Sequence, residues 1–276
     1  LYESLALLLE QSRPKLQRLI DDHEAQAAAR LSEGNRLIAE LLVDVAACRR
    51  SVAAQPDLER GALRELHDAV RSSEQRCVEA LLRLYGFRPQ DAAAADLPLL
   101  DGRWGDDLFN PETLKELGVK IGGGMAAGAA AGAGVDLMVG GITMGAAALL
   151  GALAGGGAQT ARHYGNRLLG KLKGQRELTV DDGGLRLLAV RQRQLLVALA
   201  ARGHAAMEAI RLDAPEDKTW REGKLPEALH RCRAHPQWSS LNPGARLEQA
   251  ERQQQLMELV RTLQRLGFAP LRLLDQ

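Results

Sequence analysis

Two long stretches near the start of the chain repeat apolar residues at intervals of three and four, which is the period of an amphipathic α-helix. They cover residues 14–54 and 57–86. Gln55-Pro56 interrupts the pattern between them, because proline cannot continue a helix. We therefore predict a long antiparallel helical hairpin over residues 12–86 with charged outer faces, in which Gly34 marks a place where the first helix could bend.

Residues 87–109 follow neither the helical nor the strand period, and we interpret them as a linker or an ordered loop. Their last part contains two aromatic and two acidic residues. We predict that Trp104 and Phe109 anchor this loop on the helical hairpin, and that Asp106 and Asp107 either cap the next helix or meet a basic segment further along. Asn110, followed by proline, then begins a new helix.

Residues 121–158 contain thirteen glycines and a single charged residue, Asp136. Each glycine in a helix costs about 1 kcal/mol relative to alanine, so close packing must compensate. Several of these glycines recur at intervals of four, which places them on one helix face where another helix can approach closely. They are Gly124, Gly128, Gly132, Gly141, Gly145, Gly151 and Gly155. We predict a glycine-zipper hairpin with Asp136 near its tip, inside a region that spans residues 110–176.

A basic amphipathic stretch follows this predicted hairpin and completes the region. Its cations are Arg162, Arg167, Lys171, Lys173 and Arg176, and leucines lie between them. Each such cation near an anionic membrane surface contributes about 1 kcal/mol of binding, so the stretch is suited to lipid headgroups.

The rest of the chain, residues 177–276, predicts a C-terminal helical region. One helix begins at Asp181-Asp182 and ends near Gly203, and a short helix covers residues 226–234. Trp238 is predicted to be an aromatic anchor, and Asn242 to begin the last helix. The predicted fold class is therefore all-α.

The glycine-rich run has two interpretations. A membrane-spanning helix needs about 20 apolar residues. Residues 137–158 supply 22 and residues 121–135 supply 15, so the hairpin could insert into a bilayer. Alternatively, the hairpin is the buried core of a soluble helical scaffold whose long hairpin binds an unknown protein partner. The pattern alone leaves both open.

The charge balance and the cysteine content of the chain bear on its partners and on its compartment. The 276 residues include 36 basic and 35 acidic side chains, and this balance argues against nucleic acid as a partner. Three widely spaced cysteines and no signal peptide predict a cytoplasmic protein, either peripheral to the inner membrane or inserted through the hairpin. Because the chain begins with Leu1 rather than Met, we expect it to be a piece of a longer protein.

The sequence offers no convincing catalytic, cofactor or metal site. A phosphate-binding loop needs lysine and Ser/Thr directly after its glycines, but Val135 follows Gly134. His230, Cys232 and His235 lack a fourth ligand nearby, and two arginines between them oppose a cation. We therefore expect this chain to be non-enzymatic and to carry no cofactor.

Several motifs nevertheless resemble those of one bacterial family. They are Trp104-Gly-Asp-Asp-Leu-Phe-Asn-Pro-Glu, Gly140-Gly-Ile-Thr143, Arg176-Glu-Leu-Thr-Val-Asp-Asp182 and Pro236-Gln-Trp-Ser-Ser-Leu241. Together they resemble the uncharacterised domain of unknown function 3482, over essentially the whole chain.

That resemblance implies a larger GTP-binding protein. Members of the family typically follow a small GTPase domain, so residues 1–11 would be the tail of such a domain, and the GTPase would be a partner in cis. No GTPase motif lies within the 276 residues, and no nucleotide-binding residue is carried over. Our interpretation is a non-enzymatic effector or membrane-docking region of a bacterial GTPase, which engages a bilayer or a membrane protein.

Overall fold

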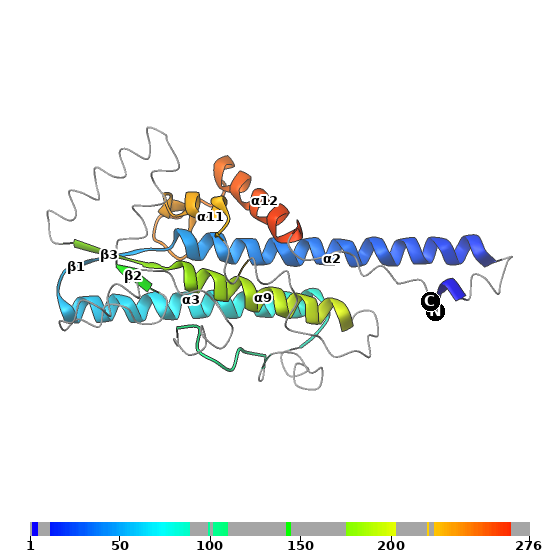
Figure 1. The fold of residues 1–276 in the computed structure, drawn as a ribbon, viewed down its shortest axis with the longest axis horizontal. Coiled ribbons are helices and arrows are strands. Elements are labelled where there is room, and N and C mark those ends of the chain that lie inside the picture. The colour runs from blue at the N-terminus through cyan, green and yellow to red at the C-terminus, as the bar shows by residue number, and fades with distance from the viewer. Residues whose placement is uncertain are drawn as a thin grey trace.

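The structure is a computed structural model that describes residues 2–4, 12–88, 99, 102–109, 142–144, 175–202, 220 and 224–265. Within these residues the protein is mostly helical, as predicted, and its helices surround one core (Figure 1). Of the predicted glycine-zipper hairpin, only the backbone of Ile142–Met144 is described.

The predicted long hairpin consists of α2 (Arg13–Ala47) and α3 (Pro56–Leu84), which run in opposite directions. The first helix ends earlier than the predicted residue 54. Cys48 leaves the helical conformation with φ −66° and ψ 136°, and Arg50–Ala53 then form strand β1. The apolar period continued past Ala47 in the sequence, but backbone pairing with a distant strand decides the conformation there.

A small antiparallel sheet is the main feature that the helical pattern did not predict. Its strand order is β1-β3-β2, in which β3 is Gln175–Val180 and β2 is Ile142–Met144. The prediction of a helix through Ile142–Met144, in the second arm of the hairpin, is therefore wrong at these residues. Strands of three to six residues show too little alternation to be recognised, and their partners lie far away in sequence.

The central helix of the fold is α9 (Asp182–Arg202), which lies against both α2 and α3 (Figure 1). It begins and ends where the sequence predicted, and most of its residues are buried. Its approach to α2 is close at Gly34, where an added Cβ would overlap the buried Leu196 side chain. Gly34 is therefore a site of close helix packing within a continuous helix.

The C-terminal elements cover another side of α2. They are α11 (Glu227–Cys232), the 3₁₀ turn η2 (Pro236–Trp238) and α12 (Ala250–Arg265). The last helix begins at Ala250, so the prediction that it starts at Asn242 is wrong. The Asn242 side chain instead holds a turn against α2, and Gly244 takes φ +72°, which is not helical.

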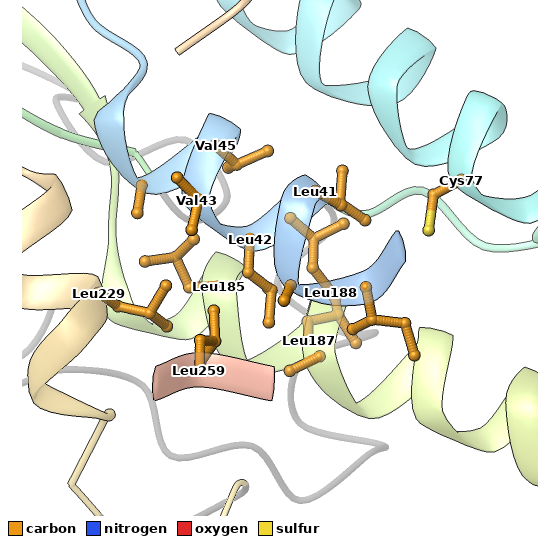
Figure 2. Packing of buried hydrophobic residues seen from close by; sticks show 14 of the residues in the cluster. Leu41, Leu42, Val43, Val45, Cys77, Leu185, Leu187, Leu188, Leu229 and Leu259 are labelled. Atoms are coloured by element: carbon orange, nitrogen blue, oxygen red, sulfur yellow. The ribbon is translucent and has the colours of Figure 1, made fainter. Parts of the chain in front are cut away.

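The core forms where α2, α9, α11 and α12 meet, and Figure 2 shows it from close by. Leu42, Leu185, Leu188, Leu229 and Leu259 are all fully buried there. In contrast, most residues of α2 between 13 and 30 are exposed, and this part of the helix extends beyond the bundle (Figure 1). Burial of the apolar stripe therefore stabilises the C-terminal half of α2 more than its N-terminal half.

Candidate functional site

Two clusters of polar and aromatic side chains lie where the described chain leaves and re-enters the bundle around the glycine-rich run. We call the first the entry joint, formed by residues 102–109 with α3 and α9. We call the second the exit joint, formed by β3, the start of α9, the end of α2 and residues 233–242. Together they define the candidate functional site, because they fix the ends of the segment for which the sequence predicts function.

Two aromatic side chains of the loop pack against the helices of the entry joint. The Phe109 ring is 3% exposed and stacks on His67 of α3, with 3.8 Å between ring centroids and 14° between planes. The Arg191 guanidinium of α9 lies 5.3 Å from the centroid of the half-buried Trp104 ring, a cation–π contact. The loop is thus held against α3 at one end and against α9 at the other.

An ion pair between Arg71 of α3 and Asp107 of the loop also stabilises the entry joint. The Arg71 side chain donates two hydrogen bonds to Asp107, with Nη2 2.7 Å from Oδ2 and Nε 3.1 Å from Oδ1. Asp107 Oδ1 also accepts the Phe109 backbone N–H at 3.2 Å. Burial opposes ionisation of Asp107, but these hydrogen bonds outweigh it and hold the pKa of that carboxyl below its ordinary value. The loop is therefore fixed by an ionised side chain.

Beneath the loop lies a buried ion pair between α3 and α9. Arg191 Nη1 lies 3.6 Å from Glu74 Oε1, and the two side chains are 2% and 8% exposed. Gln192 Nε2 donates to the same Glu74 oxygen at 3.3 Å, and Arg191 Nη2 donates to the Asp106 carbonyl at 2.8 Å. Burial raises the pKa of Glu74 despite the nearby guanidinium. Arg191 thus links both helices to the loop.

His67 is a buried histidine of the entry joint. Burial lowers its pKa, and the Arg71 cation lowers it further, while Asp107 and Asp68 act in the opposite direction. Its Nε2 is buried without a hydrogen-bond partner among the described residues. The ring is therefore neutral at pH 7, and the joint is best formed with His67 uncharged.

Asn242 organises the exit joint through four hydrogen bonds. Its Nδ2 donates to the Ala47 carbonyl at 3.0 Å and to the Pro236 carbonyl at 2.8 Å. Its Oδ1 accepts the Arg49 backbone N–H and Arg50 Nη1, both at 3.1 Å. These bonds satisfy the backbone where α2 ends and β1 begins, so one amide side chain joins the C-terminal turn to the sheet.

Two buried arginines extend the exit joint. Arg233 Nη1 lies 2.7 Å from Asp182 Oδ1, and Arg233 Nη2 donates to the Val180 carbonyl at 3.2 Å, which fixes the turn from β3 into α9. Arg252 of α12 lies 2.6 Å from Glu40 of α2 and donates to the Trp238 carbonyl at 2.8 Å. Arg233 therefore fixes the end of β3 to the start of α9, and Arg252 fixes α12 to α2.

The predicted site residues divide into three groups. Trp104, Asp106, Asp107 and Phe109 lie in the entry joint. Trp238 lies in the exit joint, where its 3%-exposed ring stacks on His235 at 4.0 Å and its Nε1 donates to Gln249 at 2.7 Å. The third group lies outside the described residues. It consists of Gly124, Gly128, Gly132, Asp136, Gly141, Gly145, Gly151, Gly155, Arg162, Arg167, Lys171 and Lys173.

Arg176 differs from the other predicted headgroup cations. It lies in strand β3, opposite Val52 of β1, rather than in a basic amphipathic stretch. Its Nε is 3.3 Å from Glu59 Oε1 of α3, although the Arg176 side chain itself is exposed. Arg176 therefore belongs to the sheet, and its contact with headgroups stays a prediction.

Sequence reasoning missed the partners of the joints, above all Glu74, Arg191 and Asn242. Arg191 to Gln194 form a polar run inside an otherwise apolar helix, and this interruption was the available signal. It could not identify Glu74, because that pairing joins residues far apart in the chain. Asn242 was predicted to cap a helix, because asparagine favours that position. Its side chain instead bonds to the Ala47 carbonyl at the end of α2, far away in sequence.

The three cysteines and several histidines and carboxylates lie among the described residues. Among these residues, no group of three or more His, Cys, Asp or Glu side chains is placed to hold a metal ion. Burial raises the pKa of the Cys48 thiol to about 11 and that of the Cys77 and Cys232 thiols to about 12, so all three are protonated at neutral pH. Of the described helices, none combines the length and apolar character needed to cross a membrane.

The described residues form a mostly helical domain that also contains a three-stranded antiparallel sheet. The sequence model of the family described as Domain of unknown function (DUF3482) matches residues 1–261, and the chain belongs to this family. Neither a curated protein nor a solved structure matches the chain.

Proposed function

We propose that this chain is a non-enzymatic helical effector region that holds the glycine-rich run and delivers it to a bacterial membrane. The observation that carries the proposal is the fastening of the chain on both sides of that run. Phe109 is buried in the entry joint, and β3 begins at Gln175 in the centre of the sheet. In this account the bundle holds the chain on both sides of the segment between the two joints.

The sequence between the joints supports a lipid surface as the target. It contains an apolar run with one charged residue, followed by Arg162, Arg167, Lys171 and Lys173 before strand β3 begins. Apolar residues beside cations suit a bilayer with anionic headgroups, since burial and charge both contribute to binding. In this account a GTPase domain in cis, which the family resemblance implies, controls how the bundle holds the segment.

Flotation of the full chain with liposomes tests the proposal. We expect the chain to float with vesicles that contain anionic lipid and to float less with neutral vesicles. Substitution of Lys171 and Lys173 by glutamate should reduce flotation at least fivefold. The matched control is the same double change at Arg60 and Arg64 on the exposed side of α3, which should have little effect.

The salt dependence of flotation separates two forms of contact. Binding that persists at high salt indicates insertion of the apolar run, and binding that salt abolishes indicates headgroup contact by the basic residues alone. A folded helical chain that floats with no vesicle at either salt concentration would refute the membrane proposal.

A second candidate, a soluble protein-interaction scaffold, is favoured by one specific observation. Ile142–Met144 belongs to the glycine-rich run in sequence, yet it is a strand of the bundle's own sheet. In this account the run packs with the bundle, and protein partners bind elsewhere, for example along the exposed N-terminal part of α2. Absence of flotation, together with retention of a defined partner on immobilised chain, would favour this scaffold.

A further inference from the structure

The loop of the entry joint, residues 102–109, lies on the His67 side chain of α3. The Phe109 ring of the loop stacks on the imidazole, and the neighbouring Leu108 is buried as well. His67 is 7% exposed. A positive charge on this ring would therefore lie between the helix and the loop, away from most of the solvent that could stabilise it.

The hydrogen bonding of the His67 ring favours its neutral form. Its Nε2 is buried without a hydrogen-bond partner among the described residues. In a neutral imidazole with its proton on Nδ1, this atom is an unpartnered acceptor. In an imidazolium both ring nitrogens carry a proton, so Nε2 becomes a charged donor without an acceptor. An unpaired buried group costs more when it is charged, so protonation destabilises the closed position of the loop.

The charged groups around His67 come from α3 and from the loop. The Arg71 guanidinium lies 5.4 Å from the centroid of the same Phe109 ring on which His67 stacks. Asp107 of the loop and Asp68 of α3 both accept hydrogen bonds from Arg71. Burial and the Arg71 cation lower the pKa of His67, and the two carboxylates act in the opposite direction. Both carboxylates are thus already paired with Arg71, and neither accepts a hydrogen bond from His67 Nε2.

His235 of the exit joint lacks this combination of features. Its ring also stacks on a buried aromatic residue, Trp238. However, His235 is only half-buried, and Gln237 Nε2 lies 3.3 Å from its Nδ1. A charge on His235 would therefore remain partly solvated, so the stronger effect of acid is expected at the entry joint.

We infer that the stacked His67–Phe109 pair is a pH-sensitive switch, in which a neutral imidazole holds the loop closed on α3 and protonation opens it. The closed state is the one in the structure. Opening exposes Leu108 and Phe109 and separates Asp107 from Arg71. The inference goes beyond the proposed membrane function and does not depend on it.

Alkylation of a cysteine placed in the loop measures its opening. The variant is Leu108→Cys in the full chain, because this side chain is 2% exposed when the loop is closed. Its alkylation rate, divided by that of a free cysteine peptide at the same pH, gives the open fraction. An ordinary histidine pKa of 6.5 in the open state limits the rise between pH 7 and pH 5 to about 25-fold, and we expect at least about fivefold.

Two histidine variants in the Leu108→Cys background assign the effect. His67→Phe keeps a ring for Phe109 to stack on but cannot be protonated, so its open fraction should change less than twofold between pH 7 and pH 5. His23→Gln, at an exposed position of α2, should keep the full rise. The native Cys232 is buried in α11 and reports opening elsewhere, so its alkylation relative to the free peptide should not change.

NMR of the unaltered chain gives a second readout that needs no cysteine variant. The ring protons of His67 are identified by their absence from His67→Phe. At pH 7 they are shifted by the ring current of Phe109, whose centroid is 3.8 Å away. They should return to the values of free histidine as the ring is protonated. If Leu108→Cys lowers the helical content seen by circular dichroism, this readout decides.

Several results would overturn the switch. An open fraction that is equal at pH 7 and pH 5, or a protonated His67 that keeps its ring-current shift, would show that the loop stays closed. A full rise in His67→Phe would assign the effect to another group, such as Glu74 beneath the loop. Equal acceleration at Cys232 would show that acid opens the whole bundle rather than the loop.

Discussion

Removal of the Arg191 side chain is the sharpest test of the entry joint. The substitution Arg191→Met keeps most of the apolar volume but removes the cation beside Glu74, whose side chain is 8% exposed. Breaking a buried pair by removing one partner costs about 3–5 kcal/mol, because it leaves an uncompensated buried charge. The Asp106 carbonyl also loses its hydrogen bond from Arg191. We therefore expect the free energy of unfolding to fall by about 4 kcal/mol at pH 7.

The pH dependence of that loss identifies its cause. Glu74 already has a raised pKa because of burial, and loss of Arg191 raises it further. A carboxyl whose pKa is higher in the folded than in the unfolded state binds more protons when folded, so stability rises as pH falls toward the unfolded pKa. The deficit of Arg191→Met should therefore be clearly smaller at pH 5 than at pH 7.

Urea unfolding followed by circular dichroism at both pH values measures this deficit. The control is Arg36→Met on α2, because Arg36 forms an exposed pair with Glu33 at 2.7 Å. Exposed pairs contribute at most about 1 kcal/mol, so the control should change stability little at either pH. A deficit of Arg191→Met below about 1 kcal/mol, or one of equal size at pH 5 and pH 7, would show that the buried pair does not have the assigned role.

Three further predictions concern single positions in the fold. Gly34→Ala should lower stability by about 1–3 kcal/mol in thermal or urea unfolding, because the new Cβ would overlap the buried Leu196 side chain. Gly61→Ala, with no atom within 4 Å of its new Cβ, should be neutral or stabilising. His67→Phe should make the free energy of unfolding depend less on pH below about 6.5. In wild type the neutral buried ring contributes stability that is complete above the ordinary pKa of 6.5 and is lost as pH falls below it toward the lowered folded value. Asn242→Ala should cost about 2–3 kcal/mol, since it leaves the Ala47 carbonyl and the Arg49 N–H without their partner, and an equal loss from the exposed Arg246→Ala would argue against that role.

The two joints are connected through helix α9. Arg191 couples α9 to the entry joint, and Arg233 couples β3 to the start of α9 at the exit joint. A change in how α9 packs against α2 would therefore reach both ends of the glycine-rich run.

The sequence by itself determined the helical framework of the protein. The three- and four-residue period located α2 and α3, because each has an apolar stripe that is repeated over many turns. Asp181-Asp182 marked the start of α9, since acidic residues favour the first turn of a helix. The unusual composition of residues 121–158 also distinguished that run from the rest of the chain.

Only the tertiary structure decided where the chain forms strands and which charges meet. Residues 50–53 continue the apolar period of α2, yet they pair with β3, because hydrogen bonds to a partner over a hundred residues away stabilise a strand that local preference does not. Ile142–Met144 likewise pairs with β3, although the sequence around it predicted a helix. Glu74 is a polar residue on a helix when viewed in sequence, and it becomes half of a buried ion pair only when α9 brings Arg191 to it. Local periodicity specifies helices, whereas long-range pairing of backbone and charge specifies the joints that hold them together.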